Sequence, residues 1–250
     1  MSLSDPGGSS VTQPAPQFTT THWSLIQAAG QGEDPQKAEA LAELCQRYWA
    51  PLYAFVRRRG YGVHDAEDLT QEFFRRLLER NYAGEADQTR GRFRSFLLGA
   101  LKHFLADAWD KARAQKRGGG HLLVALDTRV LENQNELELA DRLTPEQVFD
   151  RRWALTLLDR VLKRLEAEHQ AAGKGASFRA LKGYLTAEEQ ARPYAEAAAT
   201  LGTSEGAVKV AVHRLRQRYR ALLHEEVAST LTDPNRVEEE LRDLFAAFER

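Results

Sequence analysis

The sequence contains a single cysteine, Cys45, among 250 residues. It can therefore form no internal disulfide and no zinc site built from cysteines, which is typical of a reducing compartment. No apolar run approaches the roughly 20 residues that a membrane-spanning helix needs. The first 20 residues also lack the basic start and apolar centre of a signal peptide. These absences predict a cytoplasmic protein with no membrane partner.

The residue patterns of common enzymes are missing too. There is no HExxH zinc spacing, no nucleophile elbow and no glycine-rich loop that opens a helix. The one glycine run, 118–120, follows a helical pattern instead of starting one. The seven histidines lie far apart in the sequence. We therefore predict no enzyme activity, no cofactor and no metal-ligating residue.

The chain has almost no net charge, since 35 Lys and Arg face 36 Asp and Glu. Near neutrality at first argues against a nucleic-acid binder, but the charges are segregated. Basic residues outnumber acidic ones eight to two over 89–120 and five to one over 204–220. Acidic residues outnumber basic ones seven to two over 122–150 and eight to three over 221–250. Two basic blocks alternate with two acidic ones, which predicts two separate anion-binding surfaces.

No convincing strand pattern of period two occurs, whereas helical spacing of apolar residues recurs along the chain. The sequence thus predicts an all-α fold with two small helical domains joined by an acidic linker. The expected parts are a disordered tail (1–20), a first domain (21–120), the linker (121–143), a second domain (144–223) and an acidic helical extension (224–250).

Three local signals refine the helix boundaries. Pro51 should kink or restart the first long helix, because proline lacks the N–H donor and clashes with the preceding turn. Asp65 is expected to cap a helix over 65–80. Thr144 and Gln147, with Pro145 between them, predict a capping box at the start of the second domain. Cys45 falls in the apolar series of the first helix, which favours a core thiol.

The most informative stretch is 194–220, YAEAAATLGTSEGAVKVAVHRLRQRYR. It predicts a short helix, a tight turn at Gly202 and a second helix capped by Ser204. The second helix has an apolar face (Val208, Val212 and Leu215) and a basic remainder. This combination is typical of a helix-turn-helix that reads DNA. The alternative is a helical hairpin whose basic face is only solvated.

With both basic blocks placed, the chain resembles bacterial RNA polymerase sigma factors of the extracytoplasmic-function (ECF) class over about residues 22–223. DAEDLTQEFF (65–74) resembles the helix with which that family binds the polymerase clamp. GRFRSFLLGALKHFLADAWDKARAQKR (91–117) resembles the regions that melt and read the −10 promoter element. Residues 194–220 resemble the reader of the −35 element. More narrowly, the chain resembles groups that carry a C-terminal extension.

The resemblance implies a factor that binds the clamp helices and flap of core RNA polymerase, recognises promoter DNA, melts the −10 element and starts transcription. An anti-sigma factor or another regulator is a further partner that the resemblance allows. The expected polymerase contacts are Asp65, Glu67, Asp68, Gln71 and Glu72. The expected −10 contacts are Arg90, Arg92, Phe93, Arg94, His103, Lys111, Arg113, Lys116 and Arg117. The expected −35 contacts are Ser204, Glu205, Lys209, His213, Arg214 and Arg216.

Each assignment has a structural alternative. Acids at the start of helix 65–80 also complement the helix dipole. Phe93, Phe96 and Trp109 have the spacing of core residues as well as the chemistry of base platforms. His103 stands where the family usually has Asn. Val210 and Ala211 replace positions where the family often has a polar residue and Arg, which predicts weaker direct base reading and more reliance on phosphates and DNA shape.

The C-terminal extension places its apolar residues on one helical face (Val237, Leu241, Leu244, Phe245 and Phe248). This face predicts docking onto the second domain. A sharper hypothesis is that the acidic extension masks the basic surface of the recognition helix. For the whole chain, the competing functions are a DNA-binding regulator that does not join polymerase and a scaffold for another helical partner.

Overall fold

A computed structural model of the chain describes residues 22, 34–79, 92–116, 142–185 and 193–249. Within these ranges the chain is helical apart from short turns and one isolated bridge between Arg92 and Leu231. The predicted all-α class is confirmed for this part of the chain. The expected disordered tail and residues 121–141 of the expected linker lie outside the described residues, as do Arg90 and Arg117.

The helices follow one another in two groups. The first group comprises α2 (Asp34–Arg58), α3 (Val63–Glu79) and α5 (Phe93–Lys116). The second group comprises α7 (Pro145–Ala171), α8 (Gly175–Leu181), the short 3-10 helix η2 (Lys182–Leu185), α9 (Tyr194–Leu201) and α10 (Glu205–Ala228). A second 3-10 helix, η4 (Pro234–Arg236), then leads into α11 (Val237–Ala246).

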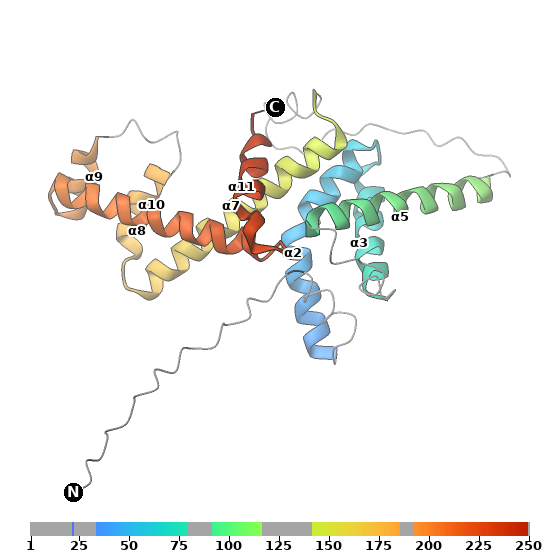
Figure 1. The fold of residues 1–250 in the computed structure, drawn as a ribbon, viewed down its shortest axis with the longest axis horizontal. Helices are drawn as coiled ribbons and strands as arrows, with labels where there is room; N and C mark the ends of the chain where they lie inside the picture. The colour runs from blue at the N-terminus through green and yellow to red at the C-terminus, as the bar shows by residue number, and fades with distance from the viewer. Residues whose placement is uncertain (1–21, 23–33, 80–91, 117–141, 186–192, 250) are drawn as a thin grey trace, which may run out of the picture.

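Helices α2 and α7 pack against each other in the middle of the molecule (Figure 1). Helices α3 and α5 lie at one end of this pair, and α8, α9 and the start of α10 lie at the other. Tyr48 and Phe55 of α2 and Phe149 and Trp153 of α7 belong to one continuous buried cluster. An apolar core therefore runs through both predicted domains, and the boundary between the domains remains a prediction.

Pro51 lies inside α2, which continues from Asp34 to Arg58. The predicted restart of the helix at this proline is therefore wrong, and the alternative expectation, a kink within the continuous helix, stays a prediction. Tyr48, Leu52 and Phe55 flank the proline and are fully buried. Burial of a large apolar side chain contributes roughly 1.5–3 kcal/mol. Burial on both sides thus offsets the loss of one helical hydrogen bond at Pro51.

The two predicted caps have different outcomes. Thr144 forms the capping box, because its hydroxyl accepts from the backbone N–H of Gln147 at 3.2 Å while the Gln147 side chain accepts from the backbone N–H of Thr144 at 2.8 Å. Asp65, however, lies in the first turn of α3, which already begins at Val63. Its assignment as the cap is therefore wrong, because the cap position is Gly62, three residues earlier, whose carbonyl accepts from the backbone N–H of Ala66 at 2.9 Å. The charge of Asp65 lies within the first turn of that helix.

His22 ties the N-terminal side of the described chain to the end of α10. Its backbone N–H donates to the carbonyl of Ser229 at 3.0 Å, and its ring nitrogen Nδ1 lies 2.7 Å from the hydroxyl of Tyr48. The ring is buried and meets Phe93 edge-on, with ring centroids 5.6 Å apart. This junction joins α2, α5 and the end of α10.

Candidate nucleic-acid interface

Helices α9 and α10 form the predicted helix-turn-helix. The turn is made at Gly202, whose φ of +61° lies in the left-handed region that favours glycine. Ser204 then caps α10, and its hydroxyl accepts from the backbone N–H of Ala207 at 3.2 Å. Val208 and Val212 are buried on the inner face of α10 together with Leu215. The local prediction for 194–220 is confirmed, including the turn at Gly202 and the cap at Ser204.

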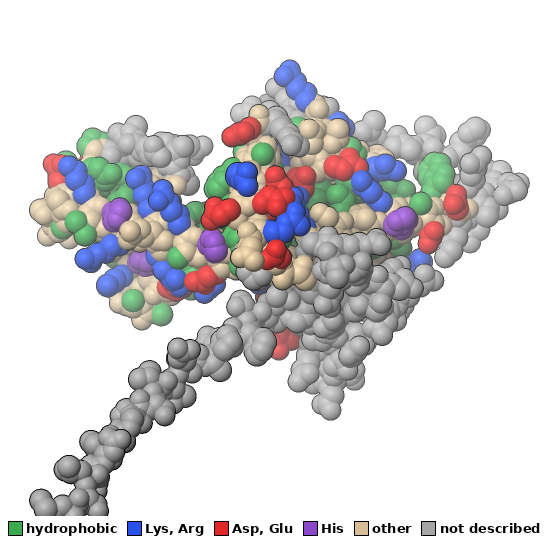
Figure 2. Space-filling view, viewed as in Figure 1, with side chains coloured by type: hydrophobic (Ala, Val, Ile, Leu, Met, Phe, Trp, Pro, Cys, Tyr) green, Lys and Arg blue, Asp and Glu red, His purple; other side chains and the backbone are tan. Residues whose placement is uncertain are grey.

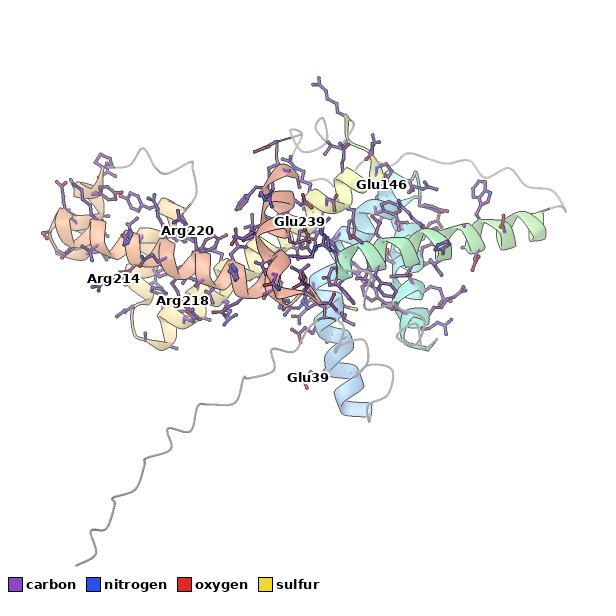
Figure 3. The ribbon with its side chains drawn as sticks, in the orientation of Figure 1. Glu39, Glu146, Arg214, Arg218, Arg220 and Glu239 are labelled. Carbon is purple, nitrogen blue, oxygen red and sulfur yellow. The ribbon has the colours of Figure 1, made fainter. Side chains whose placement is uncertain are left out.

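The outer face of α10 carries most of the predicted −35 residues. They are exposed and come from its cap and first three turns (Ser204, Glu205, Lys209, His213 and Arg214). Basic and histidine side chains are visible over this part of the molecule in Figure 2. Figure 3 shows that Arg214 and Arg220 leave opposite sides of the helix. The structure thus brings these five predicted residues together on one helix start.

Arg216 has a different position from the other predicted −35 residues. It is partly buried, and its Nε and Nη2 atoms donate to the carbonyl of Tyr184 at 3.1 and 2.8 Å. Its guanidinium therefore joins α10 to η2. Arg218 is similarly engaged, since it pairs with Glu168 of α7 at 2.7 Å. That pair raises the pKa of Arg218 above its ordinary range, chiefly through the hydrogen bond to Glu168.

The two described arginines at the start of the first basic block are bound by carboxylates. Arg92 pairs through Nη2 with Glu239 at 2.8 Å and through Nε with Glu240 at 2.8 Å, and it also contacts Asp243. Arg94 pairs through Nε with Glu240 at 2.6 Å. All three acids belong to α11, and Figure 3 shows Glu239 beside the start of α5.

Arg94 is the more enclosed of the two arginines, with 7% of its surface exposed. Its guanidinium also contacts Asp150 and lies over the ring of Trp153, 4.7 Å from the centroid. Burial lowers the pKa of Arg94, but the hydrogen bond to Glu240 and the surrounding carboxylates raise it to a net value above the ordinary one. In this structure Arg94 is a charged core residue rather than an open cation.

Phe93 and Trp109 differ in burial. The sequence alone allowed either residue to be a core residue or a base platform. Phe93 is fully buried and packs on Tyr48, with ring centroids 5.3 Å apart. Trp109 is 54% exposed on the far half of α5, which extends away from the other helices (Figure 1). The core interpretation therefore fits Phe93 and is wrong for Trp109.

The rest of the predicted −10 block lies along α5. His103 is exposed on the outer side of that helix. Lys102 beside it pairs with Glu146 of α7 at 2.8 Å, and this contact lowers the pKa of Glu146. Lys111, Arg113 and Lys116 occupy the last turns of α5. These positions extend the predicted surface from His103 toward the end of the helix.

Helix α3 presents the predicted polymerase contacts unevenly. Asp65, Glu67, Asp68 and Gln71 are exposed. Glu72 instead accepts hydrogen bonds from Arg75 at 2.6 Å and from Arg76 at 2.7 Å, both on the same helix. The hydrogen bonds from Arg75 and then Arg76 lower the pKa of Glu72 to about 2. The open part of this acidic surface is therefore its first two turns.

The contacts of α11 revise both expectations for the C-terminal extension. Val237 and Leu244 are buried against the rest of the molecule, and α11 packs on α10 and α7, as docking predicts. Phe245 is 50% exposed, however, and the acidic Glu240 is as fully buried as Leu244. Glu239, Glu240 and Asp243 pair with Arg92 and Arg94 of α5 instead of with the predicted −35 residues of α10. Sequence reasoning did not predict these ion pairs, although the opposite charges of 89–120 and 221–250 were available as a signal.

The described residues contain no cluster of His, Cys, Asp and Glu that could hold a metal ion. Within the same ranges, every helix is too short or too polar to cross a bilayer. Cys45 is half-buried, and burial raises the pKa of its thiol. A raised thiol pKa lowers the thiolate fraction, which fits a packing residue better than a nucleophile.

Comparison with known proteins gives a consistent match over most of this architecture. Residues 22–227 match the family described as ECF sigma factor. The chain is also 27% identical over 190 residues to a Streptomyces coelicolor protein named "ECF RNA polymerase sigma factor BldN". That similarity covers 76% of this chain and 61% of the relative, so the chain spans less than two thirds of that protein. No solved structure matches the chain.

Proposed function

Because the chain belongs to the ECF sigma factor family, we propose that it binds core RNA polymerase, brings it to promoters and starts transcription there. Two surfaces support this proposal. One is the exposed acidic start of α3, and the other is the outer face of the helix-turn-helix. They lie on different groups of helices within one chain.

The acidic surface of α3 is the observation that carries the polymerase assignment. Asp65, Glu67 and Asp68 are all exposed within the first two turns of one rigid helix. Acidic groups on an exposed helix favour a basic partner and speed its association. A regulator that acts without polymerase is not expected to depend on this surface, so the surface distinguishes the two functions. We assign it to the clamp helices of core polymerase.

The outer face of α10 is the proposed reader of the −35 element. Helix-turn-helix proteins insert the start of the second helix into the major groove. His213 and Arg214 lie on that exposed part, whereas Arg216 is engaged with Tyr184. Groove contacts therefore fall mainly to the first three turns of α10, with Arg214 as the principal cation.

Helix α5 is the proposed −10 surface. His103 is exposed near its middle and Trp109 is exposed on its far half, which ends in the turns that hold Lys111, Arg113 and Lys116. Aromatic stacking combined with a basic track is the usual chemistry of single-strand binding. Trp109 is therefore a better base platform than the buried Phe93.

Transcription reconstituted from purified parts tests the proposal. DNA fragments are first selected from a random pool by the protein mixed with core polymerase, and the enriched fragments then serve as templates. We expect runoff transcripts that require both the protein and core polymerase. If the protein binds DNA alone and yields no transcript with core polymerase, it is a regulator of the other class. If it binds neither DNA nor core polymerase, the alternative function as a scaffold for another helical partner is favoured.

A further inference from the structure

The outer face of α10 contains an apolar side chain that neither the fold nor the basic character of the helix explains. Val210 is 51% exposed. It lies two residues from both Val208 and Val212, which are buried, and so roughly 160° around the helix from each. Val210 therefore stands at the centre of the face opposite the core.

The residues one turn before Val210 are unusually small. Gly206 and Ala207 are both exposed on this face. A side-chain carbon placed on Gly206 would meet only the hydroxyl of Ser204, at 3.9 Å, and its φ lies outside the left-handed region. Neither packing nor backbone geometry therefore requires glycine, although glycine in a helix costs about 0.5–1 kcal/mol relative to alanine. Close approach of a partner to the backbone would account for it.

The residues next to Val210 indicate which kind of partner this face would bind. His213 and Arg214 follow one turn later on the same face, and both are exposed. A cation and an imidazole beside an apolar side chain match a major-groove edge next to the phosphate backbone. The apolar group that this edge offers is the 5-methyl of thymine.

We infer that Val210 is a specificity-determining residue that contacts the 5-methyl group of a thymine in the −35 element, while Gly206 and Ala207 let the helix approach. This inference rests on the proposed function, since it needs α10 in a promoter groove. It also revises the role of Val210. From the sequence, this residue was expected to weaken direct base reading. Here it reads a base through an apolar contact.

Deoxyuridine substitution tests the contact, because it removes the thymine methyl and keeps base pairing. Each thymine of the −35 element of a selected promoter is replaced in turn, and holoenzyme binding is measured. We expect about a fourfold loss at one position, the size of one buried methyl group. The variant V210A should lose this sensitivity. The control L155A changes an exposed leucine of α7 and should keep it.

The outcomes separate this inference from the proposed function. Promoter-dependent transcription with no deoxyuridine effect, or with the same effect in V210A, overturns the contact and leaves the function standing. Failure to bind core polymerase or to select any promoter overturns both. A deoxyuridine effect that only V210A abolishes supports the assignment.

A second inference comes independently from the contact between α11 and α5. Glu240 is fully buried and receives Arg94 at 2.6 Å and Arg92 at 2.8 Å. The backbone is joined as well, since the N–H of Phe93 donates to the carbonyl of Thr230 at 3.2 Å. Figure 2 shows acidic and basic side chains interleaved at this place. Glu239, Glu240 and Asp243, here named the α11 acidic cluster, thus surround both arginines.

Both arginines belong to the basic block that the sequence assigns to DNA. A guanidinium that is held by two carboxylates has its donors and its charge already satisfied. A nucleic-acid phosphate must therefore displace the α11 acidic cluster to reach either guanidinium. We propose that α11 is an intramolecular competitor of nucleic acid, whose carboxylates occupy Arg92 and Arg94 until the helix is displaced.

Binding of the full chain to a labelled single-stranded DNA of about 20 nucleotides tests this competition, because phosphate contacts need no promoter sequence. The double variant E239Q/D243N removes the two carboxylates of the α11 acidic cluster whose side chains are not buried, and keeps Glu240 paired with the buried Arg94. We expect it to bind DNA several-fold more tightly than the wild type at fixed salt. Adding R92Q should remove most of the gain.

The charge-matched control is E238Q/E249Q, which removes two exposed carboxylates outside the α11 acidic cluster. It should bind DNA like the wild type or only slightly better. An equal gain in the control would show a general charge effect and overturn the proposal, as would unchanged or weaker binding by E239Q/D243N. Thermal unfolding checks that each variant is folded, and E239Q alone provides a milder variant.

Discussion

Arg94 of α5 and Glu240 of α11 form a buried ion pair, with Arg94 Nε 2.6 Å from Glu240 Oε1. Glu240 is 0% exposed and Arg94 is 7% exposed. The two residues are 146 positions apart in the sequence. The pair therefore joins α5 to the C-terminal helix α11 and places a charge network inside a helical core.

Substituting Glu240→Leu should destabilise the protein strongly. Removing one partner leaves Arg94 buried without its main compensating charge, and breaking a buried pair in this way costs roughly 3–5 kcal/mol. Urea unfolding followed by circular dichroism measures the change. Glu239→Gln, at a partly exposed position of the same helix, should cost less than about 1 kcal/mol. Similar losses for the two variants would contradict the central place given to Glu240.

The stability of the protein should fall below neutral pH partly through His22. Burial, and then the charges of Arg47 and Arg160, hold the pKa of His22 well below its ordinary value of 6.5. Below about pH 6.5 the unfolded chain thus binds a proton that the folded chain does not, so acid favours unfolding. Stability should rise with pH up to that point, by at most about 1.4 kcal/mol per unit from this group.

The variant His22→Gln isolates this contribution. Its free energy of unfolding should be lower at neutral pH but should vary less than that of the wild type between about pH 5 and 7. His224 is exposed, and His224→Gln should keep the wild-type slope. A wild-type slope in His22→Gln would mean that other groups cause the pH dependence.

Arg214 and Arg216 should differ in kind, although both are basic residues of α10. Arg214 is exposed, so Arg214→Ala should weaken promoter binding and reduce the salt dependence by about one unit of slope. Arg216 donates to the carbonyl of Tyr184, so Arg216→Ala should cost roughly 1–3 kcal/mol of stability and leave the salt slope unchanged. Binding isotherms at several salt concentrations, with parallel unfolding curves, distinguish them. A reversed pattern would mean that Arg216 leaves Tyr184 when DNA binds.

Phe93 and Trp109 provide a similar contrast on α5. Phe93→Ala should cost about 3–5 kcal/mol because the ring is fully buried. Trp109→Ala should change stability by less than about 0.5 kcal/mol and weaken binding to single-stranded −10 DNA. The two readouts are thermal unfolding and fluorescence anisotropy. If Trp109→Ala binds the strand normally, Trp109 is not the base platform.

Local features of the fold were predictable because they depend on neighbouring residues. The turn at Gly202, the cap at Ser204 and the capping box at Thr144 all follow from residues within four positions of one another. The restart predicted at Pro51 does not occur, because α2 is held by packing against α7 as well as by local hydrogen bonds. Tertiary packing there outweighs the local rule.

The site shows the same division between local and distant causes. The exposure of Arg214 follows from the apolar face of its own helix. The engagement of Arg216 with Tyr184, and of Arg92 with Glu239, depends on residues 32 and 147 positions away. Charge segregation showed that opposite blocks exist, but it could not decide which acidic block meets which basic one. Only the packing of α11 determines that choice.

Binding to core RNA polymerase tests the central claim most directly. The labelled full chain is titrated with purified core polymerase, alongside Asp68→Arg and the control Glu39→Arg, which reverses an exposed charge on α2 (Figure 3). We expect saturable binding by the wild type and by Glu39→Arg, and at least about tenfold weaker binding by Asp68→Arg, equivalent to about 1.4 kcal/mol. Unchanged binding by Asp68→Arg would contradict the assignment of α3, and absence of binding by the wild type would contradict the proposed function itself.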